Sequence, residues 1–174
     1  MFPNWPRFKA ATTSVLPLAT VPVYSGEEIY EGLKKVLSQE EPEFRSNEQK
    51  EAVFAALNQQ TSLIVVLPTS GGKTLTFTLP AILRDPSVSI VVAPFNALKK
   101  DYVRRLRLAH IEHIIWHHEE TRYAPIVVVS ADRAATTGFI TYKSMLRKQK
   151  LLRRIMLNEC HLTFTASDYQ PKLQ

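Results

Sequence analysis

A short segment with two adjacent glycines carries the residues best suited to chemistry. It reads Leu67-Pro68-Thr69-Ser70-Gly71-Gly72-Lys73-Thr74 and follows an apolar, β-branched run over residues 63–67. Adjacent glycines let backbone N–H groups close around a phosphate, and the start of a following helix adds positive charge from its dipole. Lys73 could then reach the β and γ phosphates of a nucleotide, and the Thr74 hydroxyl could bind Mg²⁺. The segment therefore predicts a phosphate-binding loop, whereas the alternative is a glycine-rich turn without a ligand.

Strands and helices must alternate around this loop to hold it in place. β-Branched runs predict strands, buried on both faces, at residues 63–67, 88–93, 111–116, 126–130 and 154–157. Apolar spacing predicts helices at residues 27–38, 48–57, 72–83, 97–108 and 132–148. Connections of this length allow helical crossovers between parallel strands. We therefore expect an α/β fold with three layers around a parallel sheet.

The composition narrows the class of protein. A length of 174 residues suits one domain, and 45% hydrophobic with 22% charged residues is typical of a globular chain. The apolar runs are too short to cross a membrane, for which about 20 residues are needed. The single Cys160 cannot form an internal disulfide, which favours an intracellular compartment. Residues 1–26 are rich in proline and lack acidic residues, so we expect an irregular lead-in, either a linker or a transit peptide, before a domain over 27–174.

Positive charge is concentrated in one part of the chain. Residues 99–154 hold 13 Lys and Arg against 5 Asp and Glu, although the whole chain has a net charge of only +6. Such a segment could attract a polyanion. The alternative is that these side chains cover solvated helix faces.

Several segments resemble a known family. The form P-T-x-G-G-K-S/T, with Leu67 in place of the first glycine of the general phosphate-loop pattern, resembles motif I of superfamily 2 helicases, particularly the RecQ-like branch. Residues 44–49, 91–98, 129–132 and 155–161 resemble further helicase motifs in the expected order. The chain is therefore similar to the N-terminal, RecA-like P-loop NTPase lobe of a RecQ-like DEAD/DEAH-box helicase. The chain is also similar to domains that fungal genomes encode in many copies. The similarity lies in the basic segments at residues 99–101 and 104–106 and in Cys160 within residues 155–161.

The resemblance implies a role for individual residues. It assigns contacts with ATP to Arg45, Gln49, Pro68, Thr69, Ser70, Gly71, Gly72, Lys73 and Thr74. It assigns catalysis to Lys73 and Glu159, and nucleic-acid contacts to Pro94, Phe95, Lys99, Lys100, Ser130 and His161. ATP and Mg²⁺ are the implied cofactors, DNA is the implied partner with RNA still possible, and the nucleus is the implied location. For two residues an alternative stays open, because Gln49 could instead form a capping box with Ser46, and Arg45 could be a solvated charge.

Two departures from the family bear on catalysis. Asn158 stands where the D-E-x-H motif has its first acid, and an amide binds Mg²⁺ only through water and without charge compensation. The metal site would then consist of Thr74 and Asn158, and hydrolysis is expected to be impaired. The sequence also holds no second helicase lobe, so the ATP-dependent 3′–5′ unwinding implied for a complete family member is not expected of this chain alone. The alternatives are an impaired ATP- and nucleic-acid-binding fragment, or a different phosphate-loop enzyme such as a small-molecule kinase.

The remaining candidates for chemistry favour structural roles. His110, His113, His117 and His118 fall in or beside an expected strand, where they would not converge on a metal. Cys160 has no neighbouring pattern that would activate a thiol.

Overall fold

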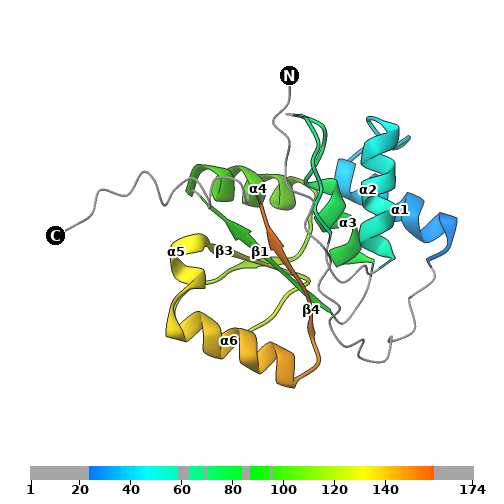
Figure 1. Ribbon diagram of the computed structural model, residues 1–174. Coiled ribbons are helices and arrows are strands. Elements are labelled where there is room, and N and C mark those ends of the chain that lie inside the picture. Colours follow the sequence, from blue (N-terminus) through cyan, green and yellow to red (C-terminus); the bar gives the residue numbers. More distant parts are fainter. Residues whose placement is uncertain (1–23, 59–62, 69, 84–86, 95, 159–174) are drawn as a thin grey trace, which may run out of the picture.

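The structure, a computed structural model, describes residues 24–58, 63–68, 70–83, 87–94 and 96–158. Its elements follow in the order α1 (Gly26–Leu37), α2 (Asn47–Leu57), α3 (Leu75–Ile82), β1 (Val88–Ala93), α4 (Asn96–Leu108), β2 (His113–Ile115), β3 (Ile126–Ser130), α5 (Ala131–Ala134), α6 (Thr137–Lys148) and β4 (Leu152–Leu157) (Figure 1). Within this described part, no helix is both long and apolar enough to cross a membrane.

The four strands of the described residues form one parallel sheet in the order β2-β3-β1-β4. Strands β1 and β3 lie at its centre, where alternate side chains point to opposite faces and nearly all are buried. Strands β2 and β4 form the edges of the described sheet, and their side chains are only partly buried. The α/β fold with a parallel sheet is confirmed, and it is the architecture of a RecA-like lobe.

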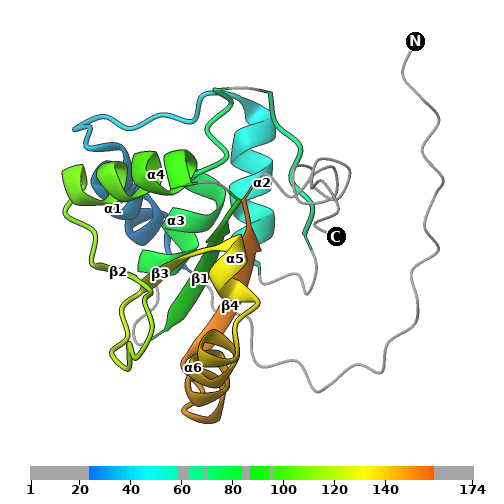
Figure 2. The same cartoon turned by 90° about the vertical axis from the view of Figure 1, so that its left-hand side faces the viewer.

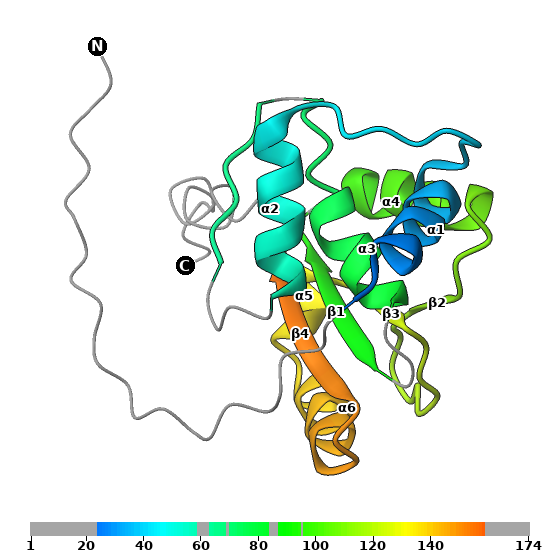
Figure 3. The same ribbon diagram turned by 90° about the vertical axis from the view of Figure 1, so that its right-hand side faces the viewer.

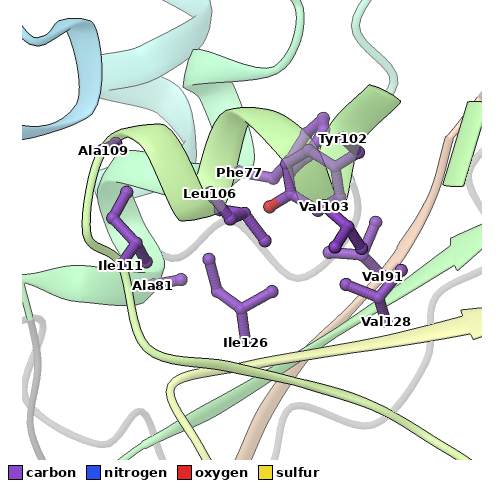
Figure 4. Packing of buried hydrophobic residues seen from close by; sticks show 10 residues of the cluster. All are labelled: Phe77, Ala81, Val91, Tyr102, Val103, Leu106, Ala109, Ile111, Ile126 and Val128. Carbon is purple, nitrogen blue, oxygen red and sulfur yellow. The ribbon is translucent and has the colours of Figure 1, made fainter. Parts of the chain in front are cut away.

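Helices cover both faces of the sheet and produce three layers (Figures 1 and 2). One face packs against α3 and α4 through a cluster that includes Phe77, Leu106 and Val91 (Figure 4). The other face packs against α6 through Trp116, Phe139, Tyr142 and Leu146. Trp116 and Phe139 meet edge to face with ring centroids 5.1 Å apart. These two apolar clusters fix the strand ends from which the site is built.

Helices α1 and α2 pack on α3 and lie outside the sheet itself (Figure 3). Their contact is a third apolar cluster formed by Leu33, Val53, Leu57, Leu75 and Leu79. Helix α3 is joined to α4 by a buried hydrogen bond of 3.2 Å between the hydroxyls of Thr78 and Tyr102. Burial raises the pKa of Tyr102, so this phenol stays neutral as a hydrogen-bonding group.

One predicted strand is wrong. Residues 63–68 have no regular secondary structure, and the side chains of Ile64 and Val66 are 86% and 88% exposed rather than buried. The prediction used β-branched residues alone, but a strand forms only where a partner supplies ladder hydrogen bonds. None of the described strands pairs with this segment.

Other predictions need smaller corrections. Strands β2 and β4 are not buried on both faces, because each is an edge strand with exposed residues such as Ile115, Ile155 and Leu157. The helix predicted over 132–148 is divided into α5 and α6. Thr136 divides it, because its hydroxyl donates to the Arg133 carbonyl at 2.7 Å and accepts from the Phe139 N–H at 3.4 Å. The helix predicted from residue 72 begins only at Leu75, since residues 70–74 form a turn.

Candidate nucleotide-binding site

The glycine segment forms a tight turn that leads directly into α3. The Gly71 N–H donates to the Pro68 carbonyl at 2.9 Å, and Ser70 and Gly72 both have positive φ angles, of 66° and 75°. Glycine adopts a positive φ at little cost, whereas Ser70 does so with some strain. A further hydrogen bond joins the turn to the start of α3, because the Leu75 N–H donates to the Gly72 carbonyl at 3.0 Å.

Two side chains at the start of α2 or just before it, those of Gln49 and Arg45, form hydrogen bonds with this turn, and we call this pair the clasp. The Gln49 amide nitrogen donates to the Gly72 carbonyl at 3.1 Å, and its amide oxygen accepts from the Arg45 N–H at 2.7 Å. Gln49 is 2% exposed, so both ends of its amide are satisfied inside the protein. The Arg45 guanidinium adds a second link, because it donates to the Ser70 carbonyl at 2.6 Å.

The capping alternative for Gln49 is met only in part. Ser46 is the N-cap of α2, and its hydroxyl accepts from the Gln49 N–H at 3.2 Å. The reciprocal bond of a capping box is replaced, because the Gln49 side chain accepts from Arg45 and not from Ser46. Contact of Arg45 or Gln49 with a base stays a prediction, but both side chains are placed against the loop that would hold the phosphates.

The far ends of α2 and α3 are joined by an arginine that the sequence did not indicate. The Arg154 guanidinium, on β4, donates to the Ala56 carbonyl at 3.0 Å and to the Pro80 carbonyl at 3.3 Å. Arg154 pairs in the sheet with Ser89, near the beginning of β1. The last turns of α2 and α3 therefore lie beside the amino half of the sheet, and both helices begin toward its carboxyl edge. This orientation directs Lys73 and Thr74 to that edge.

Three predicted site residues meet at the same edge. Ser130 ends β3 and pairs with Ala93, the last residue of β1, which Pro94 follows. Asn158 follows β4, and its N–H donates to the Val92 carbonyl at 3.0 Å. Carboxyl ends of neighbouring parallel strands are where α/β folds bind ligands. The buried Ser130 also donates a hydrogen bond that lowers the pKa of Asp132, which favours an ionised carboxylate here.

The turn fits a phosphate chain. No hydrogen bond joins the N–H groups of Gly72 or Thr74 to any other described residue, and both precede the first turn of α3. Lys73 and Thr74 are half-buried beside them. Open N–H groups at a helix start, next to a lysine, are suited to an anion. The fit for Mg²⁺ is weaker, because Thr74 and Asn158 supply neutral oxygens only.

A family comparison agrees with this geometry. The family model described as DEAD/DEAH box helicase matches residues 46–174. The chain belongs to the DEAD/DEAH box helicase family. The match contains the clasp residue Gln49, the glycine turn and the four strands that the structure describes.

Relatives of this helicase domain are RecQ-like. It is 26% identical over 148 residues to "ATP-dependent DNA helicase Q-like 4B" of Arabidopsis thaliana, covering 75% of the chain and 13% of that relative. It is 27% identical to "ATP-dependent DNA helicase hus2/rqh1" of Schizosaccharomyces pombe, covering 74% and 11%. It is 29% identical to "RecQ-like DNA helicase BLM" of Xenopus laevis, covering 74% and 10%. The chain thus spans only about a tenth of the length of these relatives, and the predicted resemblance to RecQ-like helicases is confirmed.

The structure describes only some of the remaining predicted site residues. Thr69, Phe95, Glu159 and His161 lie outside the described residues, as does Cys160. Lys99 and Lys100 lie in the first turns of α4, just after the carboxyl edge. Among the described residues, no group of three His, Cys, Asp or Glu side chains could hold a metal ion, and His113 and His117 contact backbone carbonyls instead.

Proposed function

We propose that this helicase domain binds ATP at the turn formed by residues 70–74. The observation that carries the proposal is the clasp from Gln49 and Arg45, which holds the turn open toward the carboxyl edge of the sheet. The names of the relatives, which are ATP-dependent helicases, support the same ligand. In this proposal the Gly72 and Thr74 N–H groups and the Lys73 ammonium bind the phosphates. The exposed Arg45 would meet the base beside the turn, and the buried Gln49 would hold the turn in place.

Catalysis in this proposal depends on residues at the end of β4. Bound Mg²⁺ would neutralise phosphate charge during phosphoryl transfer. Thr74 and Asn158 would hold that ion, Asn158 through a water molecule, and Glu159 would accept a proton from the attacking water. Because Asn158 carries no charge, we propose that ATP binding is retained while hydrolysis is weak. An impaired binding domain therefore stands as the second candidate function.

We further propose that the chain contacts DNA at the same edge, as part of a RecQ-like helicase that acts in the nucleus. The edge carries Pro94 and Ser130, and α4 begins there with Lys99 and Lys100. Backbone phosphates are the expected targets, so RNA would also be bound. Unwinding by a complete RecQ-like helicase would require a second lobe that closes over this edge.

Titration calorimetry with ATP tests the nucleotide site. The native chain is expected to bind ATP, and Lys73→Ala should weaken binding at least about tenfold, because a charge-assisted contact with phosphate contributes roughly 1.5–3 kcal/mol. Lys50→Ala is the matched control, since Lys50 is an exposed lysine on α2 outside the turn. Equal affinity of the native and Lys73→Ala proteins would exclude this site.

A further inference from the structure

A groove lined by side chains of α4 and of the edge strand β2 lies on the α3–α4 side of the sheet. Figure 2 shows the ribbons of these two elements. Its first part is a hollow of about 250 Å³ lined by Lys99, Lys100, Val103, Arg104, Arg107 and Ile115. Its second part is a hollow of about 340 Å³, which shares Arg107 and Ile115 with the first and extends to Arg122 and Tyr123. Because Arg107 and Ile115 line both hollows, the hollows are neighbours, and we call them together the α4–β2 groove.

The groove follows α4 away from the predicted nucleotide edge. Residues 99, 103 and 107 recur at intervals of four and therefore lie on one side of the helix. Arg107 lies eleven residues after the start of α4 at Asn96, about 16 Å along the helix axis. A strand bound at Ser130 and Pro94 would need to continue along α4 to reach it. The groove therefore begins at Lys99 and Lys100, beside the carboxyl edge, and continues along α4 beyond it.

Much of the positive charge around the groove is uncompensated, although the surface inside the first hollow comes almost entirely from the apolar parts of its side chains. Asp101, the only acidic residue of α4, is shared between Arg104 at 2.9 Å and Arg105 at 2.8 Å. The hydrogen bond from Arg104 lowers the pKa of Asp101, so this carboxylate stays ionised and is already occupied. Within the described part of the chain, no carboxylate forms an ion pair with Lys99, Lys100 or Arg107. A ligand that contacts both Lys99 and Arg107 would therefore bind best if it carried negative charge at more than one point.

The second hollow contributes a ring and a carboxylate that is already neutralised. Tyr123 is 51% exposed and could stack on a base. Glu120 binds the Arg122 guanidinium at 2.9 Å and the His117 ring at 3.2 Å, so its charge is compensated within the loop. Glu112 is the other acidic residue of this hollow and is exposed. Its charge would repel an anionic ligand at this one position.

We propose that the α4–β2 groove binds the phosphate backbone of single-stranded nucleic acid, as a second contact beyond the carboxyl edge. This rests on the proposed function, in that a helicase domain supplies the reason for a nucleic-acid ligand. A row of cations beside an exposed aromatic ring is the combination that binds single strands without sequence preference. An acidic peptide would meet the cations equally well, but Tyr123 would then have no base to stack on.

Fluorescence anisotropy with a labelled oligothymidylate tests the groove, over salt concentrations from about 50 to about 200 mM. Arg107→Gln, at the part of α4 far from the carboxyl edge, should weaken binding and reduce the slope of log affinity against log salt by about 0.7, the value for one phosphate contact in a single strand. Arg147→Gln is the control, because Arg147 is an exposed arginine on α6, across the sheet. It should leave the slope unchanged. Glu112→Gln should strengthen binding, which a destabilised fold cannot mimic.

Several results would overturn the proposal. These are an absence of binding at low salt, an equal loss for Arg147→Gln and Arg107→Gln, or a loss caused only by Ser130→Ala at the carboxyl edge. Displacement of the oligonucleotide by polyglutamate at equal charge concentration would indicate an acidic-peptide surface instead. Titration with ATP separates this proposal from the nucleotide site, since Lys73→Ala should lose ATP but keep the salt slope. If the native chain bound no ATP while Arg107→Gln still lowered the slope, the nucleotide site alone would be wrong.

Discussion

The side chain of Gln49 holds the backbone of Gly72, with its amide nitrogen 3.1 Å from the Gly72 carbonyl oxygen. A Cβ atom added at Gly72 would collide with that same amide nitrogen. The two residues lie 23 positions apart, on α2 and on the turn before α3. The shape of the candidate phosphate loop therefore depends on a residue outside the loop.

Replacing Gly72 by alanine should damage both the turn and the clasp. The φ angle of 75° is unfavourable for alanine, and the new methyl group would displace Gln49. We expect a loss of about 1–3 kcal/mol in the free energy of unfolding, together with weaker ATP binding. Urea unfolding and calorimetry measure the two effects. Gly26→Ala is the control, because nothing lies within 4 Å of a Cβ atom there, and a stability loss as large as that of Gly72→Ala would contradict the argument.

Much of this fold could be predicted because the residues that indicate a helix or a strand lie within that element or directly beside it. Helices α1, α2 and α4 match their predicted bounds to within one residue at each end, and β1 and β3 match at both ends. Ser25 and Ser46 cap α1 and α2 through their own following residues, Glu28 and Gln49. Such contacts span only three positions and can be found by spacing.

Contacts between distant residues were beyond the same approach. Arg154 contacts carbonyls 98 and 74 residues away, and nothing near it in the sequence indicates that role. The glycine turn was predicted from residue types, but the two bonds of the Gln49 side chain were not. Residues 63–67 show the converse error, because their strong β propensity has no described strand to pair with.

Arg154 should contribute measurably to stability. Arg154→Ala removes the bonds to the Ala56 and Pro80 carbonyls, and we expect a loss of about 1–3 kcal/mol in the free energy of unfolding. Arg154→Lys should recover only part of the lost stability. A single ammonium group cannot reproduce the planar guanidinium, whose two terminal nitrogens donate to two different carbonyls. The neighbouring Arg153 is exposed, so Arg153→Ala should change little. Urea midpoints that are equal for the two alanine variants would show that Arg154 does not join the helices.

Glu120 should make stability depend on pH in the acid range. Its carboxylate accepts the N–H groups of Thr121 and Arg122, and it orders the loop between β2 and β3. The hydrogen bond from the Arg122 side chain is the largest cause that lowers the pKa of Glu120 from 4.5 to about 2. A lowered pKa in the folded state gives stability that is complete above 4.5 and is lost as the pH falls toward 2.

Urea unfolding between about pH 6 and about pH 2 measures this contribution. The native protein should lose stability more steeply across that range than Glu120→Gln, which no longer titrates at this position. Glu119→Gln is the control, because the side chain of Glu119 is 85% exposed. Parallel pH profiles for the native and Glu120→Gln proteins would show that the carboxylate is not stabilised by its partners.

Asn158 provides the test of whether metal binding is impaired. Its N–H donates to the Val92 carbonyl, which fixes the residue at the end of β4, where an acid would bind Mg²⁺ in the family motif. An amide leaves the cation charge uncompensated, so ATP affinity of the native chain should change little between excess Mg²⁺ and EDTA. Asn158→Asp should raise the affinity in Mg²⁺ at least about tenfold, since the interaction of two charges in a partly buried site is several kcal/mol at contact.

The same variant in EDTA provides the internal control for Asn158. Without the metal, an added carboxylate only repels the phosphates, so Asn158→Asp should then bind ATP more weakly than the native chain. Asn58→Asp, at the exposed end of α2 toward the amino half of the sheet, controls for the added negative charge away from the carboxyl edge. If the native chain already bound MgATP as tightly as Asn158→Asp and also lost affinity in EDTA, the amide would suffice for the metal. The chain would then have a competent metal site, and the proposal of weak hydrolysis would lose its basis.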